Sequence, residues 1–215
     1  MIGTLSMIAS LPLMLTNWYC IPTDMPELIT FILGAIWIRD NKYKNLILLI
    51  PIATFNRETT IALVLLYLFY NIKREKVGIL LKRTIILSFL WLIPYITSLY
   101  LFGHMPRSNF FAFSSNMQGL LSIFRTLNPY THHYFLLYLC GFYWILAFRD
   151  FHKKDPFLKS SVLIIIIFFM YVFFRGGRIN EVRIFIPFYV FVIPLGLFNL
   201  FGGKHGSSVK SECEL

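Results

Sequence analysis

Long runs of apolar residues, separated by short polar stretches, follow one another along the whole chain. A helix needs about 20 apolar residues to cross a membrane, and the runs at 84–102 and 184–201 come close to that length. Those at 132–148 and 159–174 reach it with flanking residues, whereas the three runs between 27 and 70 are clearly shorter. The pattern predicts an all-α fold, a polytopic transmembrane helix bundle of about 6–8 segments, some short or broken. The predicted segments cover residues 1–16, 27–38, 45–55, 59–70, 84–102, 132–148, 159–174 and 184–201.

We expect one transmembrane domain over residues 1–202 and a polar cytoplasmic tail over 203–215. Lys and Arg collect in cytoplasmic loops, and two basic clusters precede the fifth and seventh predicted segments. Placing both clusters in the cytoplasm puts loops 103–131 and 175–183 on the outer face. The chain begins abruptly in hydrophobic sequence, so we also expect that upstream helices are missing.

The composition supports the membrane interpretation. The chain is 57% hydrophobic and 14% charged, whereas a soluble domain carries about 25% charged residues. The net charge of +10 is typical of cytoplasmic loops and does not indicate a nucleic-acid binder. The three cysteines have neither disulfide nor metal-ligand spacing.

Charged residues interrupt the apolar sequence at Asn56-Arg57-Glu58. A charge at the centre of a membrane helix costs roughly 2.5–3.5 kcal/mol on insertion scales, so such residues usually mark function. If the basic stretch 39–44 is also cytoplasmic, residues 45–70 form a helical hairpin with these three residues at its tip. The alternative is one long tilted span with the charges buried halfway. We favour the hairpin, because it places the polar clusters on one outer face.

Each candidate residue has a structural and a functional interpretation. Arg57 and Glu58 either form an ion pair that locks the hairpin, or Arg57 binds phosphate bidentately while Glu58 acts on the acceptor. Asp24 is either the N-cap of the following helix or a carboxylate at the mouth of the bundle. Such a carboxylate can serve as a general base or hold a divalent cation.

The segment 175–183 is the second arginine-rich candidate. Several arginines at the rim of an outer cavity suit a phosphate-linked lipid, although interfacial arginines also extend to the headgroups for purely structural reasons. Its candidate residues are Arg175, Arg178, Glu181 and Arg183.

Two short strings carry a family resemblance, Phe55-Asn-Arg-Glu-Thr-Thr60 and Glu181-Val-Arg-Ile-Phe-Ile-Pro187. Together they resemble patterns in GT-C-type membrane glycosyltransferases and related bacterial and archaeal membrane proteins. The resemblance spans roughly residues 18–200. It implies a multi-pass protein of the plasma membrane, an outer active site, a polyprenyl-phosphate sugar as donor and an acid in the first outer loop. Asp24 is the residue that matches this acid, but no Asp-Asp or Asp-x-Asp pair follows the first apolar segment.

We therefore expect transfer of a sugar from a lipid-phosphate donor on the outer face. Arginines would neutralise the departing phosphate, and Asp24 or Glu58 would deprotonate the acceptor hydroxyl. The expected partners are a polyprenyl-phosphate-linked sugar and membrane lipids, with no nucleic acid and no cofactor other than a divalent cation. The alternatives are a transporter or flippase of a lipid-linked or anionic substrate, and a non-catalytic membrane assembly subunit.

Overall fold

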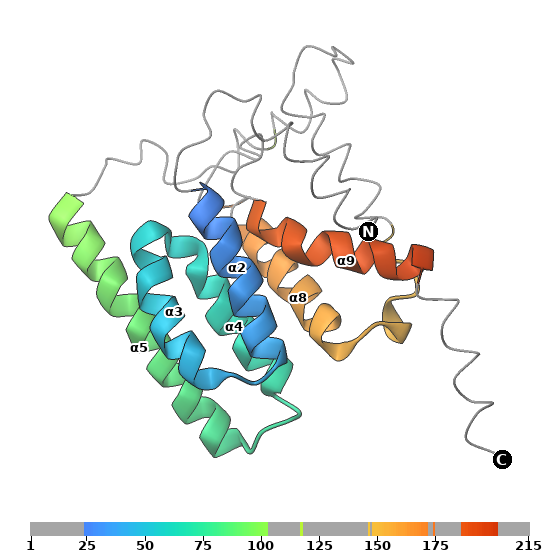
Figure 1. The fold of residues 1–215 in the computed structure, drawn as a ribbon, viewed down its shortest axis with the longest axis horizontal. Helices are drawn as coiled ribbons and strands as arrows, with labels where there is room; N and C mark the ends of the chain where they lie inside the picture. The colour runs from blue at the N-terminus through green and yellow to red at the C-terminus, as the bar shows by residue number, and fades with distance from the viewer. Residues whose placement is uncertain are drawn as a thin grey trace, which may run out of the picture.

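The first four described helices run alternately in opposite directions and pack side by side (Figure 1). A computed structural model describes residues 24–102, 117, 146, 148–171, 174 and 186–201. The regular structure of these residues is entirely helical, which confirms the predicted all-α class. The helices are α2 (Asp24–Arg39), α3 (Tyr43–Asn56), α4 (Ile61–Asn71), α5 (Val77–Phe102), α8 (Pro156–Tyr171) and α9 (Ile186–Phe201), with 3-10 turns η1 (Glu58–Thr60) and η2 (Phe151–Lys153).

The apolar runs correspond to helices within a few residues, except at the start of α5. We predicted this helix from residue 84, but it begins at Val77. Lys82 and Arg83, which precede the predicted segment, therefore lie inside the helix. Lys and Arg are good helix formers, so the helix continues into the polar sequence. The predicted segment 1–16 and most of 132–148 lie outside the described residues.

Asn41 allows the tight reversal between α2 and α3. Its φ of 57° lies in the left-handed region, which Asn tolerates better than most residues at a helix end. The next amide, that of Lys42, donates to the carbonyl of Trp37 at 2.8 Å. This bond satisfies a terminal carbonyl of α2 and directs the chain back along it.

A second reversal occurs at Arg57, between α3 and α4. Arg57 is extended, with φ −157° and ψ 138°, and its amide donates to the carbonyl of Ala53 at 2.9 Å. The Arg57 carbonyl accepts the hydroxyl of Thr60 at 2.8 Å, a bond within the turn that leads into α4. Residues 45–70 therefore form a helical hairpin, and the alternative of a single long span is wrong.

Helix α4 lies at the centre of the packing, against α2, α5 and α8. Its side chains Leu63, Leu66 and Tyr67 are fully buried. A Cβ added to Gly34 of α2 would come within 2.6 Å of Leu63 Cδ1. Glycine at this position therefore permits the close approach of α2 to α4.

Aromatic contacts and a buried lysine attach the C-terminal helices. The ring of Phe188 on α9 lies 6.1 Å from Phe31 on α2 and 4.6 Å from Phe168 on α8. Lys154 precedes α8 in the sequence, and its side chain is buried. It donates to the carbonyls of Leu146 and Leu195, each at 3.0 Å. The lysine thus joins α9 to the segment that precedes α8.

Among the described helices, one is long and apolar enough to cross a membrane. It covers Val77–Leu101, with a mean hydropathy of 1.8 and only 11% of its most apolar window buried. The apolar parts of α4, α8 and α9 are shorter. The predicted multi-pass bundle thus remains a proposal.

Candidate functional site at the hairpin tip

The tip of the α3–α4 hairpin carries a buried ion pair with the start of α2. Arg57 donates through Nη1 to Oε2 of Glu27, which lies in the first turn of α2. The Glu27 side chain is only 2% exposed, and that of Arg57 is 19% exposed. A carboxylate this deeply buried needs a charged partner, and the antiparallel packing of α2 supplies one from thirty residues away.

A hydroxyl completes the environment of the carboxylate. Thr59 Oγ1 donates to Oε1 of Glu27, so each carboxylate oxygen accepts a hydrogen bond. Arg57 and Thr59 belong to the same turn, one on each side of Glu58. The tip therefore grips Glu27 with one charged and one neutral donor, and this arrangement fixes the direction of the guanidinium group.

In one interpretation of the sequence, Glu58 is the ion-pair partner of Arg57. In the structure, the carboxylate that pairs with Arg57 is that of Glu27. Glu58 is exposed, and its backbone carbonyl accepts the indole N–H of Trp91 at 3.0 Å. Glu27 is not among the candidate residues predicted from the sequence. The overlooked signal was a carboxylate at the start of an apolar run, which needs a partner once the helix is packed.

The other predicted site residues are only partly placed. Asp24 begins α2, three residues before Glu27, so its backbone lies at the same end of the bundle. Arg175, Arg178, Glu181 and Arg183 lie outside the described residues, as does nearly all of loop 103–131. The described ends that flank 175–183 are those of α8 and α9, and Phe188 near the start of α9 packs against Phe31, one turn after Glu27.

The tip does not reach the far end of α5. Trp91, which contacts the carbonyl of Glu58, stands eleven residues before Phe102, where α5 ends. At about 1.5 Å per residue, α5 continues for about 16 Å beyond the tip. The hairpin tip, the turn between α3 and α4, therefore lies level with the interior of α5, the longest apolar helix among the described residues (Figure 1).

The opposite end of the bundle holds a second polar cluster, which the sequence analysis did not identify. Arg83 forms an ion pair with Glu75 at 2.5 Å, and its guanidinium lies 5.0 Å from the ring centre of Tyr43. Tyr67 donates to the same Glu75 carboxylate at 3.2 Å. Helix α8 starts at this end too, because the ring of Phe157 lies 5.1 Å from that of Tyr70.

The described residues contain no group of three or more His, Cys, Asp or Glu side chains that could hold a metal ion. Glu27 already accepts hydrogen bonds at both oxygens, which makes it a poor cation ligand. The predicted divalent cation therefore has no described ligand set and stays a prediction attached to Asp24.

Comparison of the chain with protein-family models, with curated proteins and with solved structures finds no match.

Proposed function

We propose that this chain is a multi-pass membrane protein. Helix α3 is apolar on all sides: Leu46 and Ile50 are buried, whereas Leu48 and Ile52 are 69% and 72% exposed. Helix α5 also exposes a continuous apolar stripe that includes Phe89 and Ile93. Soluble proteins seldom leave such surfaces in water, and lipid would cover both. Resistance to alkaline carbonate extraction tests this part of the proposal, and release into the supernatant would refute it.

The site function that we propose is binding of a lipid-linked phosphate at the hairpin tip. The observation that carries this proposal is the Arg57–Glu27 pair at the hairpin tip, which stands level with the interior of α5. Non-helical backbone and charge at membrane depth are tolerated where protein or a water-filled cavity surrounds them. Glu27, itself held by the Thr59 hydroxyl, fixes the direction of the Arg57 guanidinium group, and a fixed guanidinium group is well suited to a phosphate.

The reaction that we propose is glycosyl transfer of GT-C type from a polyprenyl-phosphate sugar. The acceptor hydroxyl oxygen would attack the anomeric carbon, and the bond from that carbon to the phosphate oxygen would break. Arg57 would stabilise the negative charge that grows on the departing polyprenyl phosphate. Glu58, which is exposed beside Arg57, would take the hydroxyl proton. Asp24 is the second candidate for this base. The arginines of the segment 175–183 would add contacts to the lipid phosphate, namely Arg175, Arg178 and Arg183, and Glu181 lies among them in the sequence.

Binding of polyprenyl phosphate, the product of this reaction, tests the site. The purified chain in lipid nanodiscs is titrated with polyprenyl phosphate, and the fluorescence of Trp91, which contacts the tip, is followed in a variant whose other tryptophans are Phe. Arg57→Lys keeps the charge but loses the planar fork, so we expect at least about tenfold weaker binding, in line with the loss of one bidentate charged contact of about 1.5–3 kcal/mol. Arg74→Ala, an exposed arginine at the opposite end, is the control and should bind like the wild type. Equal affinity of a folded Arg57→Lys protein would refute the role.

The same contacts favour a second candidate, a non-catalytic assembly subunit. Both oxygens of Glu27 accept hydrogen bonds from the tip, as expected for a pair whose role is to hold the hairpin against α2. The exchange Glu27→Arg with Arg57→Glu separates the two candidates. If the pair is purely structural, the exchanged protein keeps its fold and its assembly with partner subunits. If Arg57 binds phosphate, the exchanged protein keeps its fold but loses polyprenyl phosphate binding.

A further inference from the structure

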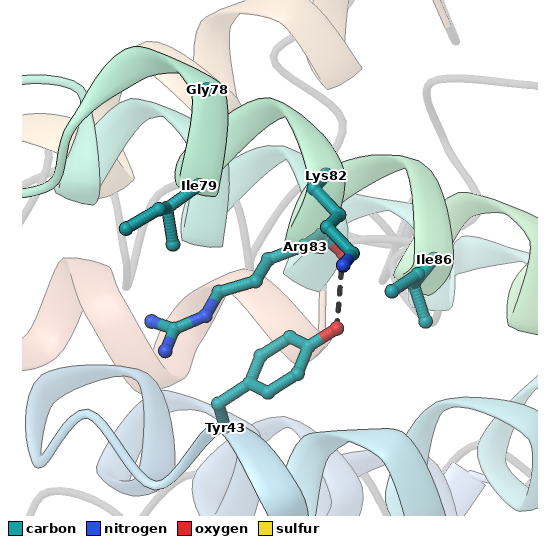
Figure 2. Close-up of a pocket in the computed structure, with 6 residues that line it drawn as sticks. All are labelled: Tyr43, Gly78, Ile79, Lys82, Arg83 and Ile86. Atoms are coloured by element: carbon teal, nitrogen blue, oxygen red, sulfur yellow. Dashed lines mark hydrogen bonds between the residues drawn. The ribbon is translucent and has the colours of Figure 1, made fainter.

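A pocket lies at the end of the bundle opposite the hairpin tip, between the start of α3 and the first turns of α5 (Figure 2). Its volume is about 370 Å³, within the range of small-ligand sites. It opens beside the Arg83–Glu75 cluster described above. The residues that line it are Tyr43, Gly78, Ile79, Lys82, Arg83 and Ile86.

The pocket combines apolar walls with a cation. Figure 2 shows Ile79, Lys82 and Ile86 extending from α5 toward Tyr43 of α3. Arg83 is already engaged, because it forms an ion pair with Glu75 and its backbone carbonyl accepts the Tyr43 hydroxyl at 3.4 Å. Lys82 forms no ion pair with any residue that the structure describes. The available charge in the pocket is therefore that of Lys82.

The surroundings of the pocket are strongly basic. Residues 39–44 and 73–83 contain eight Lys or Arg and two acids. Both acids are engaged, Asp40 with Lys42 at 3.2 Å and Glu75 with Arg83. A basic surface at the end of an apolar helix attracts anionic lipids. A bound lipid would use both the apolar walls of the pocket and the charge of Lys82, whereas a small counter-ion would use the charge alone.

We propose that this pocket binds the headgroup of an anionic phospholipid. Lys82 contacts the phosphate, Tyr43 and Ile79 border the headgroup, and Ile86, one turn after Lys82 toward the middle of α5, contacts the glycerol backbone and the first part of an acyl chain. The proposal rests on the membrane location proposed above. It assigns this end of α5 to the leaflet opposite the hairpin tip, and it gives the chain a lipid contact separate from any substrate.

Gly78 offers a way to change the pocket without disturbing the fold. A Cβ at this position meets no heavy atom within 4 Å, and glycine is a poor helix former, so substitution does not weaken α5. Gly78→Glu places a negative charge beside Lys82, whereas Gly78→Gln adds nearly the same volume without charge. The pair separates the effect of charge from that of size.

The test measures which lipid stays with the protein. The full chain is reconstituted in vesicles of phosphatidylcholine and phosphatidylglycerol in equal parts, extracted in mild detergent, and its bound lipid is quantified by native mass spectrometry. We expect phosphatidylglycerol to be enriched. Lys82→Glu and Gly78→Glu should reduce the enrichment about tenfold or more, because each removes or counteracts the charged hydrogen bond from Lys82 to the lipid phosphate. Gly78→Gln should retain the enrichment. Lys73, an exposed lysine at the same end, does not line the pocket, so Lys73→Glu should lose clearly less enrichment than Lys82→Glu.

Every other outcome overturns the inference. An equal loss in Lys73→Glu and Lys82→Glu means diffuse attraction without a site. Competition by soluble glycerol 3-phosphate at a similar concentration means a site for free phosphate instead of lipid. An inserted protein with no preference for phosphatidylglycerol refutes the pocket alone, whereas a chain that does not insert into vesicles refutes the proposed membrane location as well.

Discussion

Replacing Arg57 by Met should destabilise the fold strongly, because it leaves a buried carboxylate without its cation. Glu27 is 2% exposed and accepts from Arg57 and Thr59. Breaking a buried ion pair by removing one partner costs about 3–5 kcal/mol. Thr59 still donates in the variant, and Arg57 is 19% exposed, so we expect about 3 kcal/mol, the lower end of that range. A loss of this size is a large fraction of the stability of an ordinary domain.

The matching variants isolate the pair. Glu27→Gln leaves Arg57 without its carboxylate, but this side chain retains some access to solvent, so the cost should be smaller, about 1–2 kcal/mol. The double variant Glu27→Gln with Arg57→Met has no buried charge, and Gln can still accept from Thr59. We expect it within about 1 kcal/mol of the wild type, which gives a coupling of about 3–5 kcal/mol between the two positions.

Equilibrium unfolding in mixed micelles of sodium dodecyl sulfate and dodecyl maltoside measures these differences. The four proteins are unfolded side by side, and the coupling is taken from the double-mutant cycle. Additivity within about 0.5 kcal/mol would refute the reasoning, because it would mean that the two side chains do not stabilise each other. A double variant as unstable as Arg57→Met would refute it too, because burial of charge would then not be the cause.

Three further predictions use the same unfolding assay. Gly34→Ala should destabilise by about 1–3 kcal/mol through overpacking against Leu63, whereas Gly78→Ala, which points into open space, should stabilise by about 0.5–1 kcal/mol; equal effects would contradict the packing described. Burial lowers the pKa of Lys154, so the unfolded state binds more protons between the lowered value and the ordinary one of about 10.4. The stability of the wild type should therefore rise with pH through that interval relative to Lys154→Met, and parallel pH curves would contradict this. Trp91→Phe should cost about 0.5–1.5 kcal/mol by removing the indole N–H donated to the hairpin tip, and an unchanged midpoint would exclude that bond.

The helices were predictable because apolar runs and breaks are local signals. The interruption at residues 56–58 correctly indicated a reversal, since charge within an apolar run is costly unless the chain turns there. The predicted start of α5 lies several residues after the observed one. The charges of Lys82 and Arg83 suggested a loop, although both residue types favour helix.

The partner of Arg57 could not be predicted from local sequence. Glu27 reaches Arg57 only because α2 runs antiparallel to α3, which places the start of α2 beside the end of α3. Proximity in the sequence pointed instead to Glu58. The pocket beside Lys82 was missed for a similar reason, since it requires Tyr43 of α3 to pack against α5. Long-range pairs of this kind depend on helix packing, which apolar periodicity alone does not specify.

The most direct test of the account is the side of the membrane from which the hairpin tip can be reached. In a chain whose native cysteines are Ser, Glu58→Cys and Asn41→Cys are treated in intact cells with a small, charged, membrane-impermeant thiol reagent, before and after permeabilisation. We predict that Glu58→Cys reacts from outside in intact cells and that Asn41→Cys, at the opposite end of α3, reacts only after permeabilisation. Reaction of both positions under the same condition, or no reaction of Glu58→Cys at all, would contradict an outer, water-accessible site at the Arg57–Glu27 pair.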